Sequence, residues 1–189
     1  MTYVKASVRR PAGNPGNGIQ PKDQLVIYDV DDILSFPPRN EAGVVIEEDI
    51  VMKAGRYAIG IYLTPGTAEI SSNSDGETDA EGYTPSVKFN HPGNEQEIRE
   101  FKTNWLSKKC IVVLRYCSGK PADLIGTPCN PCKLSVSYTG SNESNTNELT
   151  FTQISKGDDI AIYRGTDTLE EPVAVVEAGA TDIDYQTDG

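Results

Sequence analysis

Residues 132–138 read Cys132-Lys-Leu-Ser-Val-Ser-Tyr138, so that apolar side chains alternate with Lys and Ser. An alternation of period two places the apolar side chains on one face of an extended chain, which predicts a half-buried β-strand. Upstream, Cys110 and Cys117 bracket the run Ile-Val-Val-Leu-Arg-Tyr, which predicts a second strand. The connection between them is rich in Gly and Pro, as expected of a loop.

The composition of the whole chain also favours strands. Its 189 residues include 15 Ile and 14 Val against 9 Leu, and β-branched side chains fit a pleated sheet better than a helix. We expect Lys53–Arg56 to join two of the further strands as a hairpin. These strands are expected at Gln24–Tyr28, Val44–Met52, Arg56–Leu63, Glu148–Ile154, Asp159–Tyr163 and Pro172–Glu177. The sequence therefore predicts a mainly β fold, an antiparallel β-sandwich or barrel of about eight strands.

One α-helix is expected at about residues 94–108 to flank this sheet. Asn94 is a favourable N-cap residue, and Glu97 stands at the third position of a capping box. Ile98, Phe101 and Trp105 follow at helical spacing and form an apolar stripe. We expect this stripe to dock the helix onto the sheet.

Charge and composition divide the chain into three parts. Residues 1–23 hold four Lys and Arg against one Asp and are rich in Pro and Gly, which predicts a flexible basic N-terminal arm. Residues 24–177 are predicted to form a single β-sandwich domain, and residues 178–189 an acidic C-terminal tail. Inside the domain, the polar residues 71–85 predict a long acidic loop.

The net charge of −11 argues against two classes of partner. Tight binding to nucleic acid depends on cations that neutralise phosphates, and adhesion to anionic membranes depends on cations as well. No stretch approaches the ~18 uncharged apolar residues of a membrane span, and the first residues lack the apolar core of a signal peptide. We therefore expect synthesis in the cytosol and no membrane binding.

The four cysteines do not predict a metal site. Cys129 and Cys132 have the spacing of half a zinc site, but Cys110 and Cys117 lie at opposite ends and on opposite faces of one expected strand. A redox Cys-x-x-Cys motif would precede a helix, whereas the residues after Cys132 alternate as a strand. We expect small structural thiols.

The sequence lacks the parts of the common catalytic sites. His91 is the single histidine, and we expect it in a surface or capping role beside the helix start. The acids of residues 71–85 superficially follow a calcium-loop spacing, but Ala80 and Ser86 stand where that loop needs Gly and Glu. We therefore expect no enzyme, with no catalytic, cofactor-binding or metal-binding residues and no cofactor.

Three stretches resemble the tail tube (major tail) proteins of tailed bacteriophages, of the kind found in phages and prophages of Bacteroidota-type hosts. They are Asn94-Glu-Gln-Glu-Ile-Arg-Glu-Phe-Lys-Thr-Asn-Trp105, Gly126-Thr-Pro-Cys-Asn-Pro131 and Gly157-Asp-Asp-Ile-Ala-Ile-Tyr-Arg-Gly-Thr166. The order of the expected elements is also similar: a mobile arm, a hairpin, a polar loop, one amphipathic helix and a second antiparallel group.

The resemblance implies a structural virion protein that forms stacked hexameric rings, with the inner strands joined into one barrel around a lumen. It implies self-assembly, contacts with other tail proteins such as the tape measure and terminator proteins, and DNA only as non-specific cargo during genome ejection. An acidic lumen would repel DNA and let it slide. The expected location is the virion tail, after synthesis in the host cytoplasm.

Two other classes of function remain open. One is another virion component, such as a tail terminator, a connector or a capsid decoration protein. The other is a β-sandwich carbohydrate-binding or adhesin module, which would show exposed aromatic side chains on one sheet face. The candidates for such a face are Tyr57, Tyr62, Tyr116 and Tyr138.

The charge asymmetry predicts how neighbouring copies contact each other. The basic arm and the acidic loop both lack the apolar side chains needed to fold alone, so we expect neighbouring copies to order them. The hypothesis assigns assembly contacts to Arg9, Arg10, Asp75, Glu77, Asp79 and Glu81.

Overall fold

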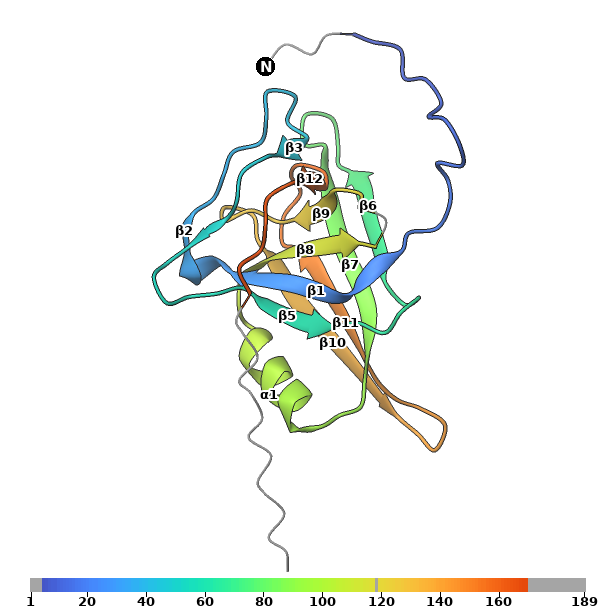
Figure 1. The fold of residues 1–189 in the computed structure, drawn as a ribbon, viewed down its shortest axis with the longest axis vertical. Helices are drawn as coiled ribbons and strands as arrows, with labels where there is room; N and C mark the ends of the chain where they lie inside the picture. Colours follow the sequence, from blue (N-terminus) through green and yellow to red (C-terminus); the bar gives the residue numbers. More distant parts are fainter. Residues whose placement is uncertain (1–4, 118, 170–189) are drawn as a thin grey trace, which may run out of the picture.

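The computed structural model describes residues 5–117 and 119–169, which form a mainly β fold with one α-helix (Figure 1). The predicted fold class is therefore confirmed. The ten strands of the larger sheet are β1 (Pro21–Asp29), β3 (Val45–Ile46), β5 (Ile59–Tyr62), β6 (Glu69–Asp75), β7 (Gly82–Pro92), β8 (Cys110–Tyr116), β9 (Ala122–Ile125), β10 (Cys132–Gly140), β11 (Asn145–Gln153) and β12 (Ala161–Tyr163). The smaller sheet pairs β2 (Ile33–Ser35) with β4 (Val51–Met52), and the helix α1 spans Gln96–Trp105.

The structure contains more strands than the sequence pattern predicts. Several of the twelve strands in the described residues have two to four residues, which is too short to leave a periodic pattern. In addition, β3 and β12 pair in parallel, so the expectation of a wholly antiparallel fold is wrong for this pair.

Two groups of strands face each other. In one group β5, β1 and β8 are neighbours, and the other group is β10, β11, β7 and β6, whose strands cross the first at a steep angle (Figure 1). Cys110 of β8 and Cys132 of β10 are register partners and join the two groups at one side. At the other side the backbone N–H of Thr64 donates to the carbonyl of Asn90 at 2.8 Å. The sheet thus folds back on itself.

Apolar side chains gather on both faces of β1 and β8. Val112 and Leu114 of β8 point into the space between the two strand groups, which we name the first core, and Ile111 and Val113 point to the opposite face, the second core. The first core includes Leu25, Ile27, Leu63, Val87, Phe89, Val112, Leu114, Cys110, Cys132, Leu149 and Phe151. The second core includes Val26, Tyr28, Ile46, Ile50, Ala58, Ile111, Val113, Leu124 and Tyr163.

Helix α1 packs against the first core as predicted, but it begins later. Its first residue is Gln96, Glu95 occupies the N-cap position without a side-chain cap, and the helix ends before the expected residue 108. Asn94 lies one residue before the N-cap position, and its side chain accepts a hydrogen bond from Lys102 Nζ at 2.9 Å. Ile98 is buried, and Phe101 pairs with Trp105 against the same core.

The predicted hairpin across residues 44–63 is wrong. Residues Val44–Met52 are not one strand: β3 pairs with β12, β4 pairs with β2, and β5 pairs with β1. The acidic residues between β3 and β4 interrupt the strand, and they bind to other segments: Glu47 pairs with Arg164, and Asp49 accepts hydrogen bonds from Thr166.

The predicted acidic loop 71–85 is also mostly wrong. Residues Glu69–Asp75 and Gly82–Pro92 pair along their length as β6 and β7, and only residues 76–81 connect them. A polar strand is stable here because the backbone supplies the pairing and Ile70 still packs against the first core. Composition alone suggested a loop, but the backbone forms a hairpin.

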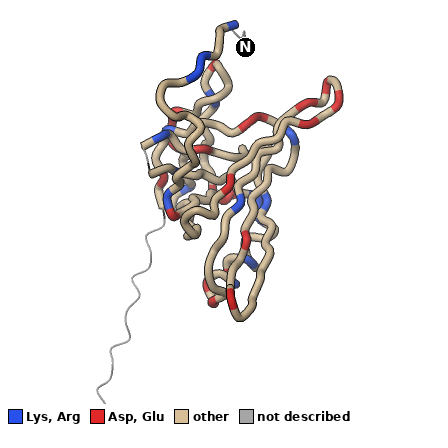
Figure 2. The backbone as a smooth tube through the Cα atoms, turned by 90° about the vertical axis from the view of Figure 1, so that its right-hand side faces the viewer, with Lys and Arg blue, Asp and Glu red and all other residues tan. Residues whose placement is uncertain are grey.

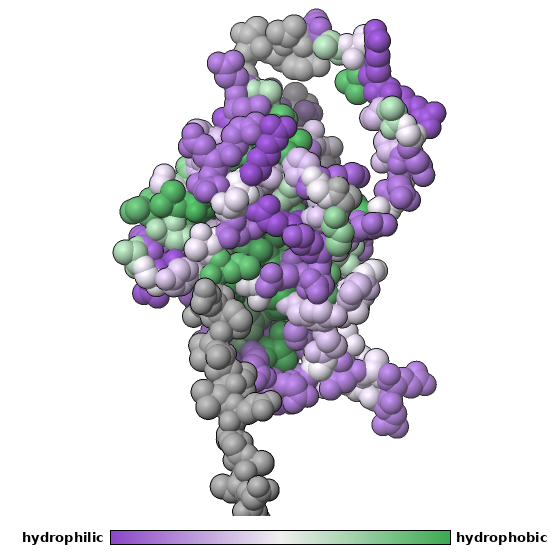
Figure 3. Space-filling model, viewed as in Figure 1, coloured by the Kyte–Doolittle hydropathy of each residue, from purple (hydrophilic) through white to green (hydrophobic). Residues whose placement is uncertain are grey.

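The structure can be compared with the expected N-terminal arm, but not with the expected C-terminal tail. Residues 5–20 are exposed and arch out from the body, and the segment returns to it where the carbonyl of Gln20 accepts a hydrogen bond from the N–H of Cys117 at 2.9 Å (Figure 1 and Figure 3). β1 begins at Pro21, inside the expected arm. The expected strand Pro172–Glu177 and the expected tail 178–189 lie outside the described residues.

Candidate functional site

In the part of the chain that the structure describes, the four-stranded group β10-β11-β7-β6 is open at both of its edges. β6 pairs with β7 alone, and within the described residues no backbone hydrogen bond reaches its other side. β10 pairs with β11 along its whole length but meets β8 only at Cys132, so its residues 133–140 offer a second unpaired edge in the described part of the chain. Unpaired strand edges are templates for pairing with another chain.

The outward face of this four-stranded group, here named the polar face, carries no large apolar side chain. The register aligns Ser135, Thr150, Lys88 and Glu69 across the four strands, and Lys88 forms an ion pair with Glu69 at 3.2 Å. Its members include Lys133, Ser135, Ser137, Thr139, Thr146, Glu148, Thr150, Thr152, Thr84, Ser86, Lys88, Asn90, Glu69, Ser71, Asn73 and Asp75. Hydroxyl groups dominate the polar face, and its two Lys stand against three acids, of which Asp75 lies at the end of β6.

The predicted acidic residues lie together at the end of the β6–β7 hairpin. Asp75 ends β6, and Glu77, Asp79 and Glu81 follow in the exposed connection, which projects from the body as an acidic tip (Figure 2). Asp75 is already engaged inside the subunit: Lys156 lies 3.1 Å from its carboxylate, and the N–H of Gly76 donates to it at 2.8 Å. Both contacts, Lys156 first, lower the pKa of Asp75.

The basic residues of the arm are not brought to this tip by the fold of one chain. Arg9 and Arg10 lie in the exposed segment 5–20, and neither forms an ion pair within the part of the chain that the structure describes. Val8 beside them is 97% exposed. A contact between arm and tip therefore stays a prediction about two copies.

The cysteines separate into a buried pair and two exposed thiols. Cys110 and Cys132 lie in the first core, where the Cys110 thiol donates to the carbonyl of Cys132 at 3.4 Å and burial raises the pKa of Cys110 to about 12. Cys117 and Cys129 are exposed. The sequence argument placed Cys110 and Cys117 on opposite faces but missed that Cys110 meets Cys132, because that contact depends on strand pairing. No three His, Cys, Asp or Glu side chains cluster as a metal site in residues 5–117 and 119–169.

His91 lies near the end of β7 rather than in a turn. Its Nδ1 is 2.9 Å from the carbonyl oxygen of Tyr62, and the two rings meet edge to face at 6.1 Å. His91 therefore helps to join the end of β7 to β5, a role that the sequence did not predict.

The four tyrosines named above do not form one aromatic face. Tyr57 precedes β5 and Tyr62 is its last residue, and both are exposed. Tyr138 lies on β10 beneath Lys102, and Tyr116 is buried and hydrogen-bonded to Asp123. This distribution does not favour a carbohydrate-binding surface built from these rings.

Comparisons with protein-family models, with curated proteins and with solved structures found no match. No helix among the described residues is long and apolar enough to cross a membrane.

Proposed function

We propose that this chain is a structural subunit that assembles with copies of itself into rings, as a tail tube protein of a tailed bacteriophage does. The observation that carries the proposal is the four-stranded group, which has two edges that no other described strand pairs with: β6 on one side and residues 133–140 of β10 on the other. When β6 of one copy pairs with β10 of the next, each copy uses two different surfaces.

Such a head-to-tail contact generates a ring when the rotation between copies closes, and a filament when it does not. Ring closure leaves no free edge in the joined barrel, which removes the aggregation risk of an open sheet. The hexameric ring and the stacking of rings come from the family resemblance. The same resemblance adds the tape measure and terminator proteins as further partners.

The polar face would line the lumen in this arrangement. Its two Lys stand against Glu69, Glu148 and Asp75, and Asp75 already pairs with Lys156. The lining therefore offers passing DNA neither a cationic surface that would hold phosphates nor the strongly acidic surface expected from the net charge. Hydroxyl groups keep such a lining hydrated. The chain's acidic excess then lies elsewhere, including the tip of the β6–β7 hairpin.

Sedimentation over a concentration series, followed by negative-stain microscopy, tests the proposal. We expect rings or tubes from the intact chain. A chain that remains monomeric at high concentration, with and without added salt, would contradict ring assembly. Single closed rings that never stack would instead favour a terminator or connector.

Proline substitutions locate the contact. Asn73→Pro and Ser74→Pro are neighbours in β6, and because successive N–H groups of a strand alternate in direction, one of the two points to the open edge. We expect that variant to fold, as judged by circular dichroism, and to lose assembly.

Two further variants test whether the arm and the tip also contribute to assembly. One deletes residues 1–22, and the other replaces Asp75, Glu77, Asp79 and Glu81 by Ser. We expect each of them to weaken assembly if its segment contacts a neighbouring copy. A charge-matched control replaces Asp31, Glu41, Glu48 and Glu143 by Ser, since these four acids are exposed and lie outside the tip.

A further inference from the structure

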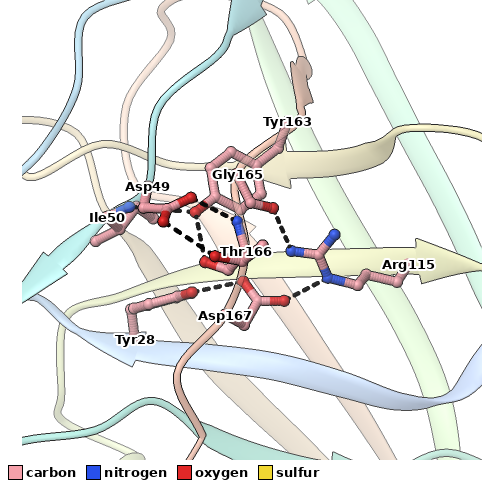
Figure 4. Close-up of polar contacts among 8 residues, drawn as sticks. All are labelled: Tyr28, Asp49, Ile50, Arg115, Tyr163, Gly165, Thr166 and Asp167. Atoms are coloured by element: carbon pink, nitrogen blue, oxygen red, sulfur yellow. Dashed lines mark hydrogen bonds and ion pairs between the residues drawn. The ribbon is translucent and has the colours of Figure 1, made fainter.

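Residues 164–169 cross the second core after β12, and we name this segment the strap (Figure 4). At its start the strap is joined to the segment between β3 and β4: Arg164 pairs with Glu47 at 2.9 Å, and the N–H of Thr166 donates to Asp49 at 2.7 Å. At its end the carbonyl of Thr168 accepts a hydrogen bond from the N–H of Ala58 at 3.1 Å.

Asp167 lies at the centre of the strap with its side chain 6% exposed. One carboxylate oxygen accepts a hydrogen bond from the Tyr28 hydroxyl at 2.5 Å, and the other accepts from Arg115 Nε. Arg115 also donates to the carbonyl of Gly165 at 2.7 Å. Burial, and the charge of Asp167 after it, raise the pKa of Tyr28, so this hydroxyl remains a donor to the carboxylate.

Tyr163 connects this buried cluster to the segment between β3 and β4. Its hydroxyl donates to the carbonyl of Thr166 and accepts from the N–H of Ile50, both at 3.2 Å. The Arg115 guanidinium lies over the Tyr163 ring, 5.5 Å from its centre. A continuous set of contacts therefore runs from Asp167 to Ile50, although no hydrogen bond or ion pair joins these two residues within the described chain.

We propose that Asp167 is the positioning residue of a conformational device in which the strap and the segment 47–50 close over the second core as one unit. Removing its charge leaves the half-buried Arg115 without its carboxylate partner, and breaking one side of such an ion pair costs more than the pair contributes to stability. Thr166 of the strap donates to Asp49, and the hydroxyl of Tyr163 in β12 bridges the carbonyl of Thr166 and the N–H of Ile50. Because both links pass through Thr166, release at Asp167 opens both segments together. This proposal concerns the subunit itself and does not depend on ring assembly.

Three amides report on the device directly. The N–H groups of Thr166, Ala58 and Ile50 donate to Asp49, to Thr168 and to Tyr163 respectively, so their hydrogen exchange measures opening at three places. The experiment compares the intact chain with Asp167→Asn by NMR-detected exchange. We expect the three amides to accelerate by a similar factor, about tenfold or more.

The control is Glu69→Gln, the same acid-to-amide change in the exposed Lys88–Glu69 pair, which should leave all three amides unchanged. An unchanged Ile50 amide in Asp167→Asn would overturn the proposal, since it would mean that the strap opens alone. If circular dichroism shows that Asp167→Asn does not fold, Tyr28→Phe removes a single hydrogen bond to Asp167 and is judged by the same three amides.

Discussion

The two cores on either side of β8 are closed by different means. The first core lies between strands of seven to eleven residues with apolar positions at alternate places, with a helix docked at its side, together with the four-residue strands β5 and β9. The second core is covered by the short strands β3, β4 and β12, by irregular chain and by the strap. Regular pairing holds the cover of the first core, whereas side-chain hydrogen bonds and ion pairs hold much of the cover of the second.

The two covers should differ in how far they can move inward when a buried side chain is made smaller. A strand inside a ladder is fixed by neighbours on one or both sides, so a side chain removed from the first core leaves a cavity. The cover of the second core is attached at a few points, such as Asp167 and Asp49, and it can move inward when space appears. We therefore expect equal deletions to cost less stability in the second core.

The largest expected effect is the loss of an aromatic ring from the first core. Phe151 is fully buried and stacks with Phe89 at 6.4 Å, and Phe151→Ala should lower the free energy of unfolding by ~3–5 kcal/mol. Urea denaturation followed by circular dichroism measures the change. A loss well below this range would show that the first core is also able to collapse.

Thiol labelling tests whether the first core stays closed. Cys117 and Cys129 are exposed, whereas Cys110 and Cys132 are buried in the first core. Burial raises the pKa of Cys110 to about 12 and that of Cys132 further, so few thiolates form at pH 8. With a chromogenic disulfide reagent, two thiols per chain should react at once and two at least ~100-fold more slowly.

Denaturant and one substitution complete the labelling experiment. In guanidinium all four thiols should react rapidly, and Cys117→Ser should leave one fast thiol in the native protein. Four fast thiols under native conditions would show that the first core opens readily and would remove the contrast between the two cores.

Val112 and Val113 provide the most closely matched comparison, because they are adjacent on β8 and face the first and the second core respectively. Each Val→Ala change removes the equivalent of two methylene groups, ~1.6 kcal/mol before any cavity is counted. We expect Val112→Ala to cost more than Val113→Ala, since only the second core can relax. Equal losses in urea denaturation would refute the proposed difference in rigidity.

The same contrast explains what the sequence could predict. The strand at Cys132–Tyr138 and the apolar stripe of α1 were predictable, because each regular element repeats its apolar positions at its own period. The split of residues 44–52 into β3 and β4, with Glu47 and Asp49 bound to the strap, depends on residues 117 positions away. No local pattern contains that information.

The candidate assembly surface was likewise predictable only where local sequence determines it. The exposed acids of the tip and the exposed arm were visible in composition, because a segment without apolar side chains is rarely buried. The open edges of β6 and β10 could not be predicted from the sequence, because a strand is an edge only if no other strand pairs with one of its sides, and local sequence does not show which strands pair. Asp167 and its partners Tyr28 and Arg115 were missed for the related reason that 139 and 52 positions separate them.

The smallest expected effect lies outside both cores, at the acidic tip. The variant that replaces Asp75, Glu77, Asp79 and Glu81 by Ser loses four exposed carboxylates. Asp75 pairs with Lys156, but this pair lies at the surface, where water and salt screen the attraction. The lowered pKa of Asp75 means that this contact is present above the ordinary pKa of an aspartate and is lost as the pH falls through the lowered value. At pH 7 the urea midpoint of the dissociated subunit should therefore match that of the parent, while sedimentation reports weaker assembly. A midpoint that falls as far as in Val113→Ala would assign the tip to the support of the fold, and the contacts between copies would then be sought at the strand edges alone.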